Sequence, residues 1–212
     1  MITISGIKYQ TELESLSFFN KNQASMLIDK KGENLDKKIA RLRKINYLLN
    51  LKKGLYTTSA FYQSINKTIY SEYIGCVLRF PSYISLEYVL SQEGIIPEAV
   101  YAVTSITIKS SRMIKNFLGQ FIYKNIKKNL FLGFEEIEWE GKKIYKATKA
   151  KALFDFLYLK NMGNLYLELN NDLRLNWEVF GERDLDEFKK YVLLSKSKKL
   201  AEILKIVEKI LV

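Results

Sequence analysis

The pattern of apolar and polar positions near the amino-terminal end predicts two consecutive helices. Asn20, with Gln23 three residues later, forms a capping-box pattern at the start of a helix over residues 21–29. We expect Asn34 to cap the second helix. Its apolar residues recur on one stripe at helical spacing: Leu35, Ile39, Leu42, Ile45 and Leu49. The second helix is therefore expected to bury one face and to expose the other.

The residues around these helices predict a turn and a hairpin. Gly32 suits a positive φ at the exit of the first helix. Residues 48–51 are typical of a short strand, residues 52–54 (Lys-Lys-Gly) of a tight turn, and residues 55–57 of the returning strand. The order helix, turn, helix and hairpin is that of a winged helix-turn-helix, which places its second helix in the major groove of DNA.

Cationic residues concentrate in the same segment. Residues 21–53 hold ten Lys or Arg and three acids, a net charge of +7 in a chain with a total of +11. On the second helix, Lys37, Arg41 and Lys44 fall opposite the apolar stripe, and lysines at the hairpin turn would reach phosphates beside the groove. A solvated charged face on a small helical domain is the alternative. The candidate DNA-binding residues are Asn34, Lys37, Lys38, Arg41, Arg43, Lys44, Lys52 and Lys53.

The rest of the chain mixes helical and strand patterns. After a connector over residues 59–70, helices are expected over residues 72–80 and from Ser82 or Ser85 to Gly94. Residues 99–147 are rich in strand patterns, including a segment from Leu130 to Phe134 and a hairpin turn at Glu140-Gly141. The last three helices are expected to be capped by Thr148, Asp184 and Ser197.

These patterns predict an α+β chain with two domains. A winged helix-turn-helix would occupy residues 1–68, and a mixed α/β domain with a mostly antiparallel sheet would occupy residues 69–212. No apolar run approaches the roughly 20 residues of a membrane span, and no basic start with an apolar core marks a signal peptide. We therefore expect a cytoplasmic protein without a membrane partner.

The composition limits the chemistry. The chain has no histidine, so neither a Ser-His-Asp nor a Cys-His site can form. Its single cysteine, Cys76, cannot form an internal disulfide and matches no zinc-ligand spacing. No glycine-rich phosphate loop is present. We therefore expect no cofactor, no metal and no catalytic residues. The net charge of +11 favours a polyanionic partner.

Two later segments resemble a known family. Residues 79–105 (RFPSYISLEYVLSQEGIIPEAVYAVTS) resemble the signature of the AbiEi family, the antitoxins and transcriptional regulators of abortive-infection (type IV toxin-antitoxin) systems. Residues 147–155 (ATKAKALFD) resemble a second family block, in which Pro and Glu usually stand where this chain has Lys149 and Ala150. The resemblance covers roughly residues 10–160.

The resemblance implies a regulator with two roles. The amino-terminal domain would bind double-stranded DNA at inverted repeats in its own promoter. The carboxy-terminal domain would counteract a nucleotidyltransferase-like toxin encoded alongside, directly or indirectly. A competing interpretation is an antitoxin that acts only through protein contacts and whose winged helix is vestigial.

Other charged groups suggest further sites. Glu138, Glu140 and Lys142 form an acid-x-Lys pattern that some metal-dependent nucleases use, and an exposed hairpin edge is the alternative. Asp155, within an apolar helix, is expected to be hydrogen-bonded or to serve toxin neutralisation. A second basic surface, facing phosphates of DNA or RNA, or simply the wet face of a sheet, is predicted at Lys109, Arg112, Lys115, Lys124, Lys127 and Lys128.

Overall fold

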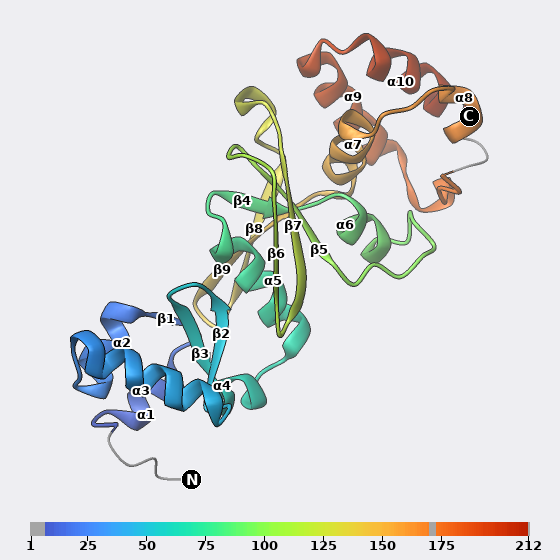
Figure 1. Cartoon of the computed structure of the whole chain (residues 1–212). Helices are drawn as coiled ribbons and strands as arrows, with labels where there is room; N and C mark the ends of the chain where they lie inside the picture. Colours follow the sequence, from blue (N-terminus) through green and yellow to red (C-terminus); the bar gives the residue numbers. More distant parts are fainter. Residues whose placement is uncertain (1–6, 170–172, 212) are drawn as a thin grey trace. The chain divides into compact units, whose positions relative to one another are not determined.

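The computed structural model describes residues 7–169 and 173–211 and confirms an α+β chain, with one antiparallel sheet and one mixed sheet (Figure 1). The chain divides into two units. The first comprises Met1–Tyr70 and Ile114–Leu118, and the second comprises Ser71–Met113 and Gly119–Val212. The division into two domains, residues 1–68 and 69–212, remains a prediction. Within the described ranges, no helix is long and apolar enough to cross a bilayer.

The first unit combines short helices with a three-stranded sheet. The sheet has the order β1-β3-β2, and both pairings are antiparallel. Gly54, with φ of 76°, lies in the tight turn that joins β2 to β3. The elements in chain order are α1 (Gln10–Ser15), β1 (Phe19–Asn20), α2 (Lys21–Ile28), α3 (Gly32–Lys44), β2 (Leu48–Lys52), β3 (Leu55–Thr58) and α4 (Ser59–Ser64).

An apolar core joins the helices of this unit to its sheet. The stripe on α3 is confirmed at Leu35, Ile39 and Leu42, which are almost fully buried. Ile45 is exposed because α3 ends at Lys44. The core comprises Leu13, Phe19, Ala24, Ile28, Leu35, Ile39, Leu42, Tyr47, Leu48 and Tyr56.

Capping confirms one helix start and corrects another. The Asn20 side chain accepts from the Gln23 amide at 3.0 Å, and the Gln23 side chain accepts from the Asn20 amide at 2.9 Å, so the predicted capping box is present. Asn34, in contrast, lies inside α3, whose N-cap residue is Lys31. The sequence prediction was wrong because the helix begins at Gly32, three residues before Leu35, where the apolar stripe begins.

Two further predictions about this region were wrong in part or in full. The positive φ of Gly32, 54°, is confirmed, but Gly32 begins α3, and the left-handed residue that ends α2 is Asp29, with φ of 59°. The connector predicted over residues 59–70 is instead helical, since it contains α4 and the start of α5 (Lys67–Leu78). Thr58 caps α4 by accepting from the Phe61 amide at 3.1 Å. Thr58 is also the last residue of the buried strand β3, so the chain turns directly from sheet into helix.

The second unit is built on a six-stranded mixed sheet with the order β6-β7-β5-β4-β9-β8. The pairs β4–β5 and β8–β9 are antiparallel, whereas β5–β7 and β4–β9 are parallel. The antiparallel pairing expected from the sequence is confirmed at β4–β5 and β8–β9, and the two parallel pairs, which the sequence did not predict, make the sheet mixed. The strands are β4 (Ser82–Ile84), β5 (Val103–Thr107), β6 (Arg112–Asn116), β7 (Gly119–Asn125), β8 (Phe134–Trp139) and β9 (Lys142–Ala147).

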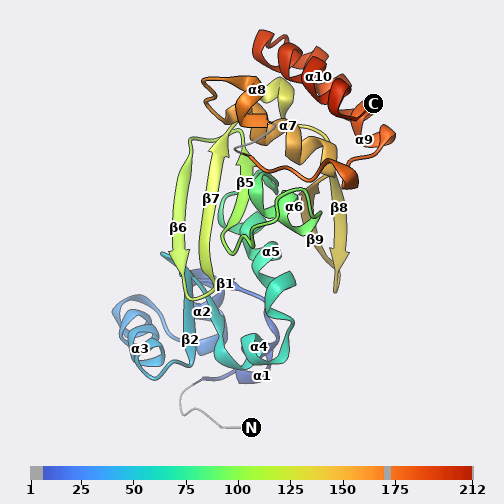
Figure 2. The same cartoon turned by 90° about the vertical axis from the view of Figure 1, so that its right-hand side faces the viewer.

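Helices cover this sheet (Figure 2). Part of α5 packs on β5 and β7, where the Tyr123 hydroxyl donates to the Gly75 carbonyl at 2.6 Å. A Cβ on Gly75 would lie 3.1 Å from the Val103 side chain, so glycine permits this close approach. Helix α7 contacts α6 and α9, and α10 contacts α8 and α9. These helices are α6 (Glu87–Gln92), α7 (Lys149–Leu159), α8 (Leu165–Leu167), α9 (Glu182–Ser195) and α10 (Lys198–Ile210), with short 3-10 turns η1 (Lys128–Leu130) and η3 (Trp177–Val179).

The second unit confirms some local predictions and corrects others. Glu140 and Gly141 both have positive φ in the predicted hairpin turn, and Thr148 and Ser197 cap α7 and α10. Asp184 is not the N-cap of α9; the cap is Gly181, whose amide donates to the Asp184 carboxylate at 3.0 Å. The helix expected from Ser82 or Ser85 begins only at Glu87, since Ser82–Ile84 forms β4. Leu130, where a strand was expected to begin, lies instead in the 3-10 turn η1.

Candidate nucleic-acid interface

Helix α3 presents the cationic residues because its apolar side chains are held in the core. Leu35, Ile39 and Leu42 fix the rotation of the helix about its axis. Lys37 and Arg41 lie four residues apart on the exposed face, so their side chains are neighbours on one surface. The helix therefore carries the amphipathic arrangement that the sequence predicts.

The structure exposes most of the candidate DNA-binding residues. On α3, Asn34, Lys37, Arg41, Arg43 and Lys44 are exposed and Lys38 is half-buried. At the turn between β2 and β3, Lys53 is exposed and Lys52 is half-buried. All eight belong to the first unit.

The acids of this unit leave most of the positive charge uncompensated. Lys37 lies 3.7 Å from Glu33, but both side chains are highly exposed, so the pair is weak. Asp36 pairs with Lys21 at 2.6 Å, which joins α3 to α2. Burial lowers the pKa of Lys38, and the neighbouring charges of Arg41 and Lys30 lower it further. Like charges therefore crowd this surface, and an anion would relieve their repulsion.

A groove lies beside the carboxyl end of α3. It encloses about 480 Å³ and is lined by Ala40, Arg43, Lys44, Asn46, Leu48, Leu49, Asn50 and Phe117. Phe117 comes from the segment Ile114–Leu118, and the side-chain amide of the neighbouring Asn116 donates to the Leu51 carbonyl at 2.9 Å. Arg43 and Lys44 thus line a concave surface. The sequence prediction missed Asn50, an uncharged residue of β2, and Phe117, which no local pattern brings to β2 from so far along the chain.

The second basic stretch is exposed but is shared between the units. Lys115 belongs to the first unit. The other five belong to the second unit and gather around the ends of β5, β6 and β7: Lys109, Arg112, Lys124, Lys127 and Lys128. All six side chains are exposed. Five of the six residues of the predicted basic surface therefore belong to one unit.

The acidic hairpin of β8 and β9 is held by ion pairs. Glu136 pairs with Lys143 at 2.8 Å, and Lys142 lies 3.8 Å from Glu140. In the part of the chain that the structure describes, no three His, Cys, Asp or Glu side chains gather where they could hold a metal ion. Glu138 faces Lys143 across the strands. This geometry is that of a hairpin with charged, exposed side chains.

Asp155 lies at the centre of a buried polar network in the second unit. Its carboxylate accepts from the Tyr83 and Ser85 hydroxyls at 2.9 and 2.8 Å and from the Lys151 ammonium at 2.5 Å. Neither Asp155 nor Lys151 is exposed to solvent. Burial raises the pKa of Asp155 and lowers that of Lys151, and the attraction between the two charges opposes both shifts. The network joins α7 to β4 and to the residue that follows it.

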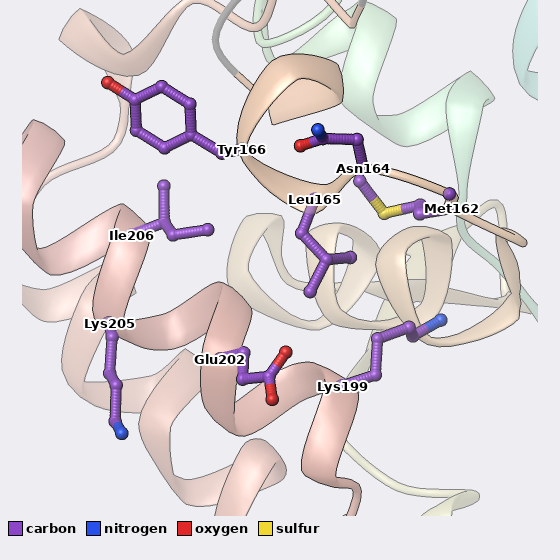
Figure 3. Close-up of a pocket in the computed structure, with 9 residues that line it drawn as sticks. Met162, Asn164, Leu165, Tyr166, Lys199, Glu202, Lys205 and Ile206 are labelled. Atoms are coloured by element: carbon purple, nitrogen blue, oxygen red, sulfur yellow. The ribbon is translucent and has the colours of Figure 1, made fainter.

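A second pocket lies between α8 and α10 (Figure 3). It encloses about 690 Å³ and is lined by Met162, Gly163, Asn164, Leu165, Tyr166, Lys199, Glu202, Lys205 and Ile206. The Lys199 ammonium donates to the carbonyls of Leu157, Tyr158 and Lys160 at 2.7, 3.0 and 2.8 Å. These carbonyls are orphan acceptors at the end of α7. Lys199 therefore stabilises a helix end, and it is not free to hold a ligand in the pocket.

Comparison with known proteins adds no relative. No protein-family model matches the chain, and no curated protein matches its sequence. Functional inference therefore depends on the geometry described above and on the resemblance in residues 79–105 and 147–155.

Proposed function

We propose that this chain is a DNA-binding transcriptional regulator and that its first unit is a winged helix-turn-helix. The observation that carries the proposal is α3: three buried apolar residues fix the helix, and Lys37 and Arg41 stand on the exposed face. A helix of this kind fits the major groove, where the first half of its exposed face contacts bases. Asn34, Lys37, Lys38 and Arg41 are the residues assigned to that half.

The remaining cations are assigned to the phosphate backbone. Arg43 and Lys44 line the groove beside the carboxyl end of α3, and Lys52 and Lys53 stand at the β2–β3 turn. In a winged helix, such a turn reaches the phosphates beside the groove. Phosphate contacts fix the orientation of the protein on the duplex but do not read the sequence. The proposal therefore separates base contacts by the first part of α3 from positioning contacts by the carboxyl end of α3 and by the turn.

We expect sequence-specific binding to the DNA upstream of the chain's own coding sequence, as autoregulation requires. At about 150 mM salt, the upstream fragment should bind about a thousandfold more tightly than a shuffled duplex of the same composition. A mobility-shift titration measures both affinities, and footprinting should locate protection over inverted repeats. Equal affinities for the two duplexes would contradict the regulator role.

The antitoxin role is proposed from the family resemblance alone. The full chain should counteract a nucleotidyltransferase-like toxin encoded beside it, without catalysis of its own. Growth of cells that express this toxin from an inducible plasmid should be restored by co-expression of the chain from a foreign promoter. The variant with Lys37, Lys38 and Arg41 replaced by Ala is the matched control, and it should still restore growth. Failure of the wild-type chain to restore growth would exclude the antitoxin role.

A further inference from the structure

An aromatic ring is displayed at one end of the sheet of the second unit. The Phe80 side chain is 63% exposed, yet its backbone is held. The Lys109 ammonium donates to the Phe80 carbonyl at 2.6 Å. The Arg79 guanidinium donates to the Ser110 carbonyl and hydroxyl at 2.6 and 2.8 Å. The ring is therefore carried on a fixed loop, although its own apolar surface remains in water.

The strand register brings three segments to this end. Ser82, at the start of β4, pairs with Thr107, at the end of β5. Thr107 also pairs with Asn125, at the end of the parallel strand β7. Asn125 contacts the loop after β5, since its amide group donates to the Lys109 carbonyl at 3.0 Å. Phe80, the loop after β5 and the residues after β7 consequently lie at the same end of neighbouring strands.

These segments supply cations and no carboxylate. Residues 79–84 and 107–129 contain neither Asp nor Glu. Among the described residues, none of the cations here forms an ion pair with a side-chain carboxylate. Apart from Lys115, which belongs to the first unit, the cations of these segments are Arg79, Lys109, Arg112, Lys124, Lys127 and Lys128. We call Phe80 and these six residues the Phe80 surface.

An exposed aromatic residue at the other end of β5 provides a contrast. Tyr101 precedes β5 and is 90% exposed. The preceding loop contains Glu98, which lies 4.0 Å from Arg174. Exposure of a ring is therefore not peculiar to Phe80. What distinguishes the Phe80 surface is the combination of the ring with six cations and no acid in the surrounding segments.

We propose that the Phe80 surface binds single-stranded nucleic acid. The cations would contact successive phosphates, and one unpaired base would stack on the Phe80 ring. Basic surfaces with an exposed aromatic ring bind single strands in this way because every base offers a π-face. Bases within a duplex already stack on each other and do not present that face. This activity is separate from duplex binding by α3.

The test measures binding of the full chain to labelled single strands of about ten nucleotides by fluorescence anisotropy. RNA and DNA oligopyrimidines are compared with an abasic strand of equal length, which keeps the phosphates but lacks the bases. Phe80→Ala should weaken binding of at least one oligopyrimidine about tenfold. Phe80→Tyr should restore it, and Tyr101→Ala is the matched control, expected to bind as wild type. On the abasic strand, wild type and Phe80→Ala should bind equally.

The comparison of RNA with DNA identifies which strand the surface prefers, and either preference supports the proposal. Equal affinity of wild type and Phe80→Ala for both oligopyrimidines would overturn it. So would an equal weakening on the abasic strand, because stacking could not then be the cause. If Phe80→Ala weakens binding to duplex DNA as much as to single strands, the surface is a duplex contact and the proposal is wrong. The variant with Lys37, Lys38 and Arg41 replaced by Ala should lose duplex binding but keep its affinity for single strands. Failure of one proposal therefore does not imply failure of the other.

Discussion

Replacing Lys37, Lys38 and Arg41 together with Ala is expected to weaken binding to the upstream DNA by about a hundredfold or more, without unfolding the chain. Removing each side chain that binds a base or a phosphate should cost about 1 kcal/mol or more, and three such costs correspond to at least two powers of ten in affinity. None of the three side chains belongs to the apolar core. Alanine also favours the helical state, so α3 should remain folded.

The control for this variant removes the same charge elsewhere. Lys196, Lys198 and Lys205 are exposed and belong to the second unit. Their triple replacement with Ala lowers the net charge equally but should weaken binding only slightly. Mobility-shift titrations at one salt concentration compare the two variants, and circular dichroism verifies that each is folded. An equal decrease in affinity for the two variants would mean that net charge, and not the face of α3, governs binding.

Asp155→Ala is expected to destabilise the second unit by about 3–5 kcal/mol, because it leaves the buried ammonium of Lys151 without its partner. The substitution also removes the acceptor for the Tyr83 and Ser85 hydroxyls. A destabilisation of this size is a large part of the roughly 5–15 kcal/mol that typically stabilises a domain. Urea denaturation followed by circular dichroism measures it. Asp186→Ala is the matched control, since the carboxylate of Asp186 is exposed and lies 3.9 Å from Lys189; its expected effect is below about 1 kcal/mol.

A double variant distinguishes the effect of the unpaired Lys151 ammonium from the effect of lost side-chain packing. When Lys151→Met accompanies Asp155→Leu, no charge remains in the network, and apolar side chains of similar size fill its place. This protein should be clearly more stable than Asp155→Ala, because replacing both members of a buried pair is often neutral. If the double variant is no more stable than Asp155→Ala, the uncompensated ammonium is not the cause of the destabilisation.

The sequence predicted the elements whose signals are local. The Asn20 capping box needs only two side chains three residues apart, and the hairpin turn at Glu140-Gly141 needs only residues that tolerate positive φ. The apolar stripe of α3 is likewise a local repeat. The exposed positions of Lys37 and Arg41 follow from it, because the buried face of a helix fixes the opposite face.

The features that were missed depend on tertiary contacts. Ser82–Ile84 is a strand of only three residues, too short to show alternation, and it is a strand because β5 and β9 flank it. The order of the sheet and its parallel pairs leave no local pattern. The partners of Asp155 include Tyr83 and Ser85, some seventy residues earlier in the chain. The groove residue Phe117 is similarly remote from α3 and β2.

The salt dependence of binding tests the central claim, that the exposed cations of α3 contact DNA phosphates and bases. If about six phosphates are neutralised, the logarithm of the binding constant should fall with the logarithm of salt with a slope of about −5. A variant with Arg43 and Lys44, the α3 cations assigned to phosphates, replaced by Ala should show a slope shallower by about one for each phosphate that it no longer neutralises. Identical slopes for wild type and variant would show that this face of α3 does not neutralise DNA phosphates and would contradict the account.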